Sequence, residues 1–176
     1  DTLIIYTSDQ GYWLGQHGLY DKRLILEGSI KMPFIVRYPK EIKVGSVNEA
    51  LCSNVDFAPT LLDMAGVDAP KAMQGFSLRP LLRGEKPANW REGIWYAYWA
   101  TGHFHWGVRT QQHKLIRFGG TSDYEFYDLK KDPFEMNNVA GQTGYKTAIT
   151  EAGQLLKKLI KQVDIKPDQM PGAKKK

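Results

Sequence analysis

A short apolar segment near the start of the chain leads into a loop that carries several groups capable of chemistry. Residues 3–6, Leu-Ile-Ile-Tyr, are followed closely by Asp9 and Gln10. A carboxylate next to a carboxamide offers hard oxygen ligands to a divalent cation. His17 and Lys22 follow in the same loop, and a lysine offers a positive charge to an oxyanion. The loop therefore has the composition of a site for a metal ion and an anionic group.

The elements around this loop predict an α/β layer. The segment 3–6 is short and bounded by turn residues, which is typical of a buried strand. Residues 33–39 predict a second buried strand, and residues 57–65 predict a helix that Gly66 ends. We also expect a short helix over 24–30, a short strand over 51–53 and a helical turn over 78–82. Because ligands bind beyond the carboxyl ends of strands in open α/β sheets, the loop after the first strand should line a crevice.

From about residue 90 the pattern changes to closely spaced strands. The segments 94–99, 106–110, 114–118 and 125–129 are separated by turn signals and predict an antiparallel sheet. Apolar residues at three- and four-residue steps over 146–163 predict a helix that lays one stripe on this sheet. We accordingly divide the chain into residues 1–88 in an α/β domain, residues 89–166 in a small α+β subdomain, and residues 167–176 in a flexible basic tail.

The composition argues against a membrane-spanning, nucleic-acid-binding or disulfide-bonded chain. The chain has 176 residues, of which 42% are hydrophobic, enough for a sizeable core. No stretch approaches the roughly 18 consecutive apolar residues of a membrane span. The net charge is +5, and the terminal Lys174, Lys175 and Lys176 supply three of these charges. A clustered basic face is not visible, so we expect no nucleic-acid partner. The single Cys52 excludes an internal disulfide.

The loop motifs, taken in order, resemble a known family. Thr-Ser-Asp-Gln-Gly at 7–11, Leu-Gly-Gln-His-Gly at 14–18, Asp-Lys-Arg at 21–23 and the segment 32–39 are similar to the C-terminal portion of the formylglycine-dependent sulfatases. Segments 107–110, 113–117, 125–129, 132–133 and 135–139 resemble the small C-terminal subdomain of that family. The resemblance implies the C-terminal part of an alkaline-phosphatase-like α/β sandwich, plus a small antiparallel-sheet subdomain packed on a C-terminal helix.

The resemblance also implies a reaction. In these sulfatases a hydrated formylglycine attacks the sulfur of a sulfate ester, while Ca²⁺ and a lysine stabilise the charge of the transferring group. The formylglycine arises from a Cys/Ser-x-Pro/Ala-x-Arg motif, which this chain lacks. We therefore expect the nucleophile to lie upstream in a missing N-terminal part of the same protein. We expect this chain to be inactive on its own.

Individual residues match the family's site. Asp9 and Gln10 match the acid–amide pair that ligates calcium. Lys22 matches the lysine that contacts a sulfate oxygen during S–O cleavage. The sequence leaves open that Asp9 and Gln10 form an ordinary turn and that Lys22 is a surface lysine paired with Asp21.

Three histidines are candidates for contacting the substrate. His17 matches a loop histidine at the active-site mouth, suited to substrate contact or proton transfer, or to a structural role between two glycines. His103 and His105 lie in the region that helps to line the substrate pocket in related enzymes, where they could bind a sugar ring. The expected substrate is a sulfated small molecule or a sulfated glycan, and the family implies a periplasmic or secreted protein.

Two other functions are compatible with the sequence. Phosphatases and phosphonate-ester hydrolases of the same superfamily usually place a histidine after the corresponding aspartate, which suits transition metals. Gln10 at that position favours calcium and sulfate. A non-catalytic carbohydrate-binding module is also permitted by the basic balance and the aromatic second half, although such a module does not need a loop with this set of groups.

Overall fold

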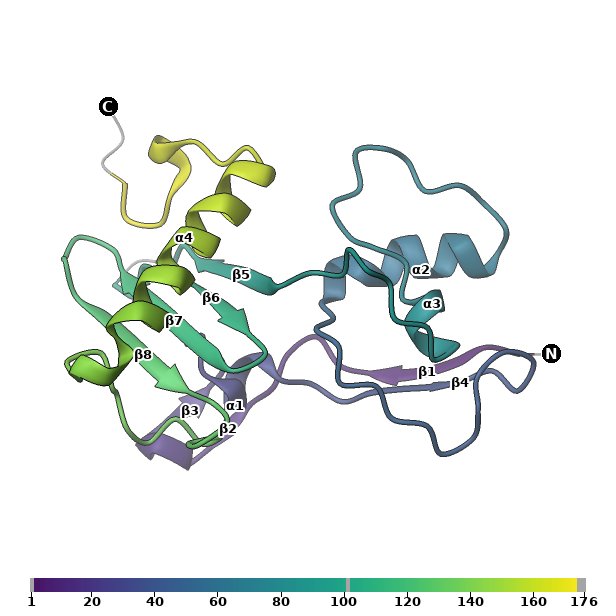
Figure 1. Ribbon diagram of the computed structural model, residues 1–176, viewed down its shortest axis with the longest axis horizontal. Coiled ribbons are helices and arrows are strands. Elements are labelled where there is room, and N and C mark those ends of the chain that lie inside the picture. Colours follow the sequence, from purple (N-terminus) through teal and green to yellow (C-terminus); the bar gives the residue numbers. More distant parts are fainter. Residues whose placement is uncertain (1, 101, 174–176) are drawn as a thin grey trace. The chain divides into compact units, whose positions relative to one another are not determined.

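The computed structural model describes residues 2–100 and 102–173 of the chain, which form two compact units (Figure 1). The first unit contains the residues up to Asp9 together with Pro33–Glu92. The second contains Gln10–Met32 together with the residues from Gly93 onward. The chain thus crosses from the first unit into the second immediately after Asp9, returns, and crosses again after Glu92. The predicted domain boundaries at residues 88 and 166 stay a prediction, and the predicted basic tail extends over residues 174–176, which lie outside the described residues.

The first unit is built on a two-stranded antiparallel ribbon. Strand β1 (Ile4–Thr7) pairs with β4 (Phe34–Arg37). The Phe34 ring stacks on Phe57 at 5.2 Å between ring centres, so one face of the ribbon meets helix α2. The remaining elements are the 3₁₀ turn η2 (Asn54–Asp56), α2 (Phe57–Met64) and α3 (Arg79–Leu82).

Three expectations for this unit are wrong. The segments 3–6 and 33–39 are not buried strands, because Ile4, Tyr6 and Ile35 are 51%, 64% and 62% exposed on the ribbon face away from α2. Within the described residues, 51–53 form no strand. The Ser53 N–H instead donates to the Asp56 carboxylate at 2.8 Å. Ser53 therefore caps the helical segment that follows and is not part of a strand.

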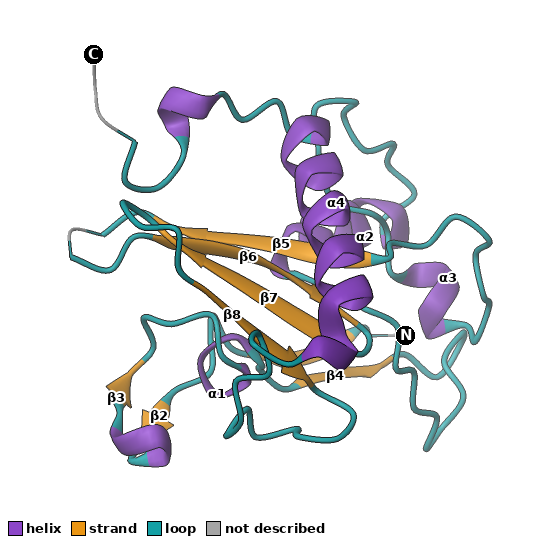
Figure 2. Cartoon of the chain, turned by 60° about the vertical axis from the view of Figure 1, so that its left-hand side comes forward, coloured by secondary structure: helices purple, strands orange, loops and turns teal. Residues whose placement is uncertain are grey.

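The second unit has a four-stranded antiparallel sheet in chain order, which confirms the sequence prediction. Its strands are β5 (Gly93–Tyr98), β6 (His105–Thr110), β7 (His113–Phe118) and β8 (Tyr124–Asp128). Helix α4 (Lys146–Gln162) lies across one face of this sheet (Figure 2). The segment 10–32 contributes β2 (Trp13–Leu14), η1 (Gln16–Gly18), β3 (Tyr20–Asp21) and α1 (Glu27–Ile30), and two further 3₁₀ turns are η3 (Thr143–Tyr145) and η4 (Pro167–Gln169).

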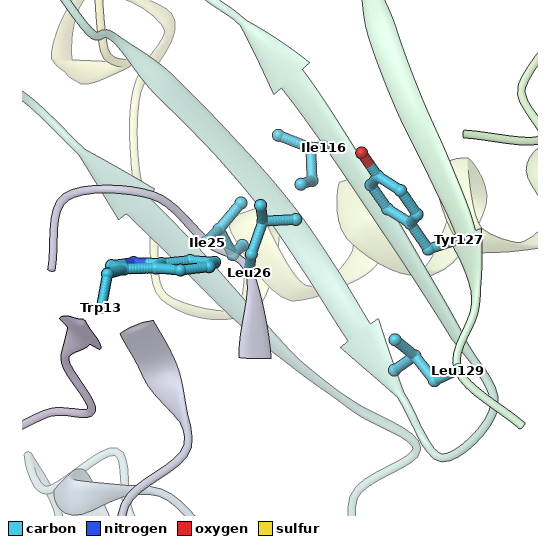
Figure 3. Close-up of a cluster of buried hydrophobic side chains, with 6 residues drawn as sticks. All are labelled: Trp13, Ile25, Leu26, Ile116, Tyr127 and Leu129. Atoms are coloured by element: carbon cyan, nitrogen blue, oxygen red, sulfur yellow. The ribbon is translucent and has the colours of Figure 1, made fainter. Parts of the chain in front are cut away.

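Both faces of this sheet are buried, because successive side chains of a strand point to opposite sides. Leu115 joins the cluster against α4 that includes Ala152 and Leu156. Its neighbour Ile116 joins a different cluster on the other face. In this second cluster Trp13, Ile25 and Leu26 of the loop pack on Ile116, Tyr127 and Leu129 (Figure 3). The loop with the candidate site residues is therefore a layer of the C-terminal unit. No described helix is long and apolar enough to cross a membrane.

A buried ion pair holds the first unit together. Asp56 is fully buried and accepts hydrogen bonds from the backbone N–H groups of Ser53 and Phe76, at 2.8 and 2.9 Å, and from both terminal nitrogens of Arg91. The Arg91 guanidinium also lies over the rings of Phe76 and Trp90, 5.0 and 5.4 Å from their centres. The Asp56 carboxylate therefore joins the start of α2, the connector after it and the end of the unit.

Replacing Asp56 should destabilise this unit strongly. In the complete protein, we expect Asp56→Ala to lower the free energy of unfolding by about 3–5 kcal/mol, because it leaves the buried Arg91 charge unpaired. Urea denaturation measures this change. Glu151→Ala, on the exposed face of α4, is the matched control and should change stability by less than about 0.5 kcal/mol. Equal effects of the two substitutions would contradict this role for Asp56.

Candidate active site

Asp9 and Gln10 lie at the point where the chain passes from one unit to the next. Asp9 is exposed, two residues beyond β1, and Gln10 is half-buried with its carboxamide oxygen shielded from solvent. The next residue, Gly11, donates its N–H to the Ser29 carbonyl at 2.8 Å. A Cβ on Gly11 would lie 2.3 Å from the Gly28 carbonyl oxygen, so only glycine fits there. This close approach to α1 fixes the backbone next to Gln10.

The metal-binding capacity of the described residues is partial. They hold no group of three or more His, Cys, Asp or Glu side chains arranged to bind a metal ion. Asp9 and Gln10 offer a carboxylate and a carboxamide oxygen, which are suitable donors for calcium, but Ca²⁺ takes six to eight oxygen ligands. The donor chemistry fits a calcium ion whose remaining ligands come from another part of the protein. Their role as calcium ligands stays a prediction.

The backbone around Lys22 is shaped by Asp21. Asp21 has a left-handed φ of 86°, and its carboxylate accepts the Lys22 N–H at 2.8 Å. The other carboxylate oxygen pairs with Arg23 Nε at 2.6 Å. The exposed Arg23 is thus an ion-pair partner of the Asp21 carboxylate, and Lys22 is half-buried. This arrangement is compatible with the predicted role of Lys22 toward a sulfate oxygen.

His17 has a clear structural contact. It lies in η1 with a left-handed φ of 56°, flanked by Gly15 and Gly18, which also have positive φ. Its ring meets Trp13 edge-on at 5.0 Å between ring centres. Nε2 lies 2.8 Å from the Phe134 carbonyl oxygen, and since a carbonyl only accepts, Nε2 carries the proton. This contact leaves Nδ1 as the ring nitrogen available to a further partner.

His103 and His105 line one pocket of about 290 Å³ in the second unit, together with Leu24, Gly102, Phe104, Phe118 and Gly119. His103 is exposed, whereas His105 is 1% exposed. Leu24 lies two residues after Lys22 in the loop, and β6 begins at His105. The loop segment next to Lys22 and the start of β6 therefore line the same pocket. His103 is the better placed of the two histidines to reach a ligand.

His105 is held as a neutral ring. Its Nδ1 lies 2.6 Å from the His103 carbonyl oxygen and donates to it. The rings of Tyr96, Tyr98 and Phe118 surround it. Burial lowers the pKa of His105, because the charged imidazolium loses its hydration. A wall of the pocket is thus formed by an uncharged imidazole.

The contact between His17 and Phe134 was not predicted from the sequence. The acceptor is a backbone carbonyl, which any residue supplies, and 117 positions separate the two partners. Phe134 lies between the segments 132–133 and 135–139, both of which resemble the family's C-terminal subdomain. This position between two motifs is the signal that points to Phe134.

Comparisons with known proteins identify the family. The C-terminal family of N-sulphoglucosamine sulphohydrolase matches residues 15–162. The chain belongs to this family of sulfatases. The predicted resemblance to the C-terminal portion of sulfatases is thereby confirmed, and the structural relatives below confirm the alkaline-phosphatase-like fold.

Individual relatives of this sulfatase chain support the assignment. An N-acetylglucosamine-6-O-sulfatase of Bacteroides thetaiotaomicron is 48% identical over 178 residues, which cover 96% of this chain and 32% of the relative. A solved complex of a protein with its substrate, D-glucosamine-2-N,6-O-disulfate, superposes with a TM-score of 0.91 at 45% identity and covers 98% of this chain and 36% of the other. The chain therefore spans about a third of the length of these relatives.

A more distant structure belongs to a different kind of enzyme. The phosphonate monoester hydrolase of Agrobacterium radiobacter has a TM-score of 0.81 and 28% identity, and the match covers 93% of this chain and 36% of that one. The fold is therefore shared between sulfatases and phosphonate hydrolases, and the reaction must be argued from the sequence relatives and the site.

The neutral state of His105 has a measurable consequence. The folded-state pKa of His105 is below its usual value of 6.5, so the unfolded chain takes up a proton that the folded chain does not. The free energy of unfolding should therefore fall as the pH is lowered from 7 to 5. His105→Phe should reduce this dependence, because phenylalanine fits among the same rings and does not titrate. Urea denaturation across this pH range tests it, and an unchanged slope in the variant would exclude His105 as the cause.

Proposed function

We propose that the complete protein is a sulfatase that hydrolyses the 6-O-sulfate ester of glucosamine or N-acetylglucosamine residues in sulfated carbohydrates. The observation that carries this proposal is the 48% identity to an N-acetylglucosamine-6-O-sulfatase over nearly the whole chain. The likeness to a complex with a 6-O-sulfated glucosamine supports the same substrate class.

Each candidate residue has a distinct task in this proposal. The Asp9 carboxylate and the Gln10 carboxamide oxygen supply part of the calcium shell, and the bound ion would neutralise negative charge on the sulfate. Lys22 places its ammonium against a sulfate oxygen and stabilises the charge that grows as the S–O bond breaks. The nucleophile, a formylglycine, belongs to the part of the protein that precedes this chain.

In this proposal, His17 and His103 contact the sugar ring of the substrate. With Nε2–H held by the Phe134 carbonyl, His17 presents Nδ1 as an acceptor for a substrate hydroxyl. His103 is exposed at the pocket that it lines with His105, so it can reach a polar group of the ring. His105 is too deeply buried for this task and forms part of the pocket wall.

A phosphonate-ester or phosphate-ester hydrolase is the second candidate, because a phosphonate monoester hydrolase shares the fold at 28% identity. Gln10 distinguishes the two candidates chemically, since a neutral carboxamide oxygen suits calcium better than a transition metal. Comparison of sulfate and phosphonate esters as substrates separates them directly.

Substitution of Lys22 tests the proposed reaction. We expect the complete protein to hydrolyse N-acetylglucosamine 6-sulfate, and Lys22→Met to lower kcat by about 10²–10³-fold, since a charge at the transferring group is lost. Arg23→Met is the matched control, because Arg23 is exposed and pairs with Asp21, and it should retain kcat within a few fold. Release of sulfate is the measurement. Wild-type kcat in Lys22→Met, or a preference for phosphonate esters, would contradict the proposal.

Removal of calcium tests the role of the acid–amide pair. A chelator should abolish hydrolysis and added Ca²⁺ should restore it. We expect Asp9→Asn to raise the Ca²⁺ concentration needed for half-maximal activity by about tenfold or more, because one anionic ligand is lost. Asp68→Asn, an exposed carboxylate of the same unit, is the control and should leave this concentration unchanged. Full activity in the presence of chelator would refute the calcium assignment.

A further inference from the structure

A buried charge cluster in the second unit has no part in the proposed chemistry. Lys114 on β7 is fully buried, and its Nζ lies 2.9 Å from Glu27 Oε1 and 2.6 Å from Glu135 Oε1. Arg109 donates to both Glu27 oxygens, at 3.3 and 3.2 Å. Two carboxylates thus face two cations, so the four formal charges balance within the cluster.

The two carboxyl groups differ in how they titrate. Burial disfavours ionised Glu27, but Lys114 and Arg109 outweigh burial and lower the pKa of Glu27 to about 2. Burial raises the pKa of Glu135, against the pull of Lys114. Glu27, at the start of α1, is therefore firmly anionic at neutral pH and anchored to strands β6 and β7.

The turn that contains Glu135 reaches the candidate catalytic loop at two separate points. The Glu27 N–H, at the start of α1, donates to Glu135 Oε2 at 2.6 Å. The carbonyl of the preceding residue, Phe134, accepts the hydrogen bond from His17. Glu135 has a left-handed φ of 56°, and its N–H bonds to the Asp132 carbonyl at 3.1 Å. This tight turn therefore directs the Phe134 carbonyl and the Glu135 side chain to different parts of the loop.

The position of α1 determines the backbone position next to Gln10, the proposed calcium ligand at the start of the loop. Ser29 of α1 accepts the Gly11 N–H, and Gly28 leaves no room for a side chain on Gly11. Gln10 is the next residue, so a shift of α1 moves the backbone that carries the Gln10 side chain. At the other end of the segment, Lys22 lies between the His17 turn and α1.

We propose that Glu135 is a positioning residue that fixes the catalytic loop, residues 10–32, through Lys114 and the start of α1. The catalytic importance of this loop rests on the proposed function. A buried ion pair contributes little net stability compared with apolar residues of similar size. The value of the cluster is therefore geometric, because a hydrogen bond such as that from the Glu27 N–H to Glu135 Oε2 is directional, whereas the apolar contacts between Trp13 and the sheet are not. Outer residues that orient metal ligands change activity by about 10–100-fold when they are lost, and we expect an effect of that order here.

The test combines hydrogen–deuterium exchange with steady-state kinetics on the complete protein. In Glu135→Gln we expect amide exchange to become at least tenfold faster within residues 10–32 and to stay unchanged in α2. With N-acetylglucosamine 6-sulfate as the probe substrate, kcat should fall about 10–100-fold while KM changes less. Glu41→Gln is the matched control, since Glu41 pairs with Arg79 and Arg83 in the first unit, and both readouts should remain near wild type.

Glu135→Gly separates the side chain from the backbone turn, because glycine adopts φ 56° without strain but lacks the carboxylate. We expect it to behave like Glu135→Gln. If the Gln variant does not fold, Glu135→Asp gives the same comparison, since its shorter carboxylate cannot reach both partners. Unchanged exchange within residues 10–32 in a folded variant, or equal acceleration in α2, would overturn the proposal.

The exchange measurement needs no substrate. If the wild-type protein does not release sulfate, the proposed function fails, and exchange within residues 10–32 still decides whether Glu135 positions the loop.

Discussion

The second unit depends on a four-stranded sheet that is covered on both faces. Helix α4 supplies one layer, and Trp13, Ile25 and Leu26 of the loop supply the other. Burial of apolar surface is the main stabilising term in folding, and here one of the two covering layers is a segment that also carries polar candidate residues. A loop with so many functional groups has little regular structure of its own. The sheet gives it a defined conformation by burying the apolar residues between the functional ones.

Much of this fold follows from sequence patterns. The strands expected over 94–99, 106–110, 114–118 and 125–129 agree with the observed strands to within two residues, and the helix expected over 146–163 is observed as Lys146–Gln162. These elements are long or repeat with a clear period, so local sequence determines them. The strand expected at 51–53 failed because Ser53 uses its N–H in capping, and a run of three residues cannot reveal that competition.

The candidate site residues can be proposed from the sequence, whereas their arrangement cannot. Residue type and spacing single out Asp9, Gln10 and Lys22 because their chemistry is local, and their roles stay a prediction. The contact between His17 and a backbone carbonyl has no sequence signature. The burial of Lys114 was equally hidden, since its neighbours Glu27 and Glu135 are 87 and 21 positions away in the chain. Lysine is seldom fully buried unless paired, so the pattern of β7 alone predicts an exposed residue there.

The path of the chain between the two units has a consequence for modularity. The chain enters the second unit after Asp9, leaves it at Met32 and enters it again at Gly93, so within this chain neither unit is a continuous stretch. A gene fusion or truncation that ends before Gly93 would keep the loop and delete the sheet on which it folds. Exchange of the C-terminal residues alone between relatives would combine a loop from one parent with a sheet from the other. Recombination in this region should therefore succeed only when residues 10–32 travel together with the sheet that covers them.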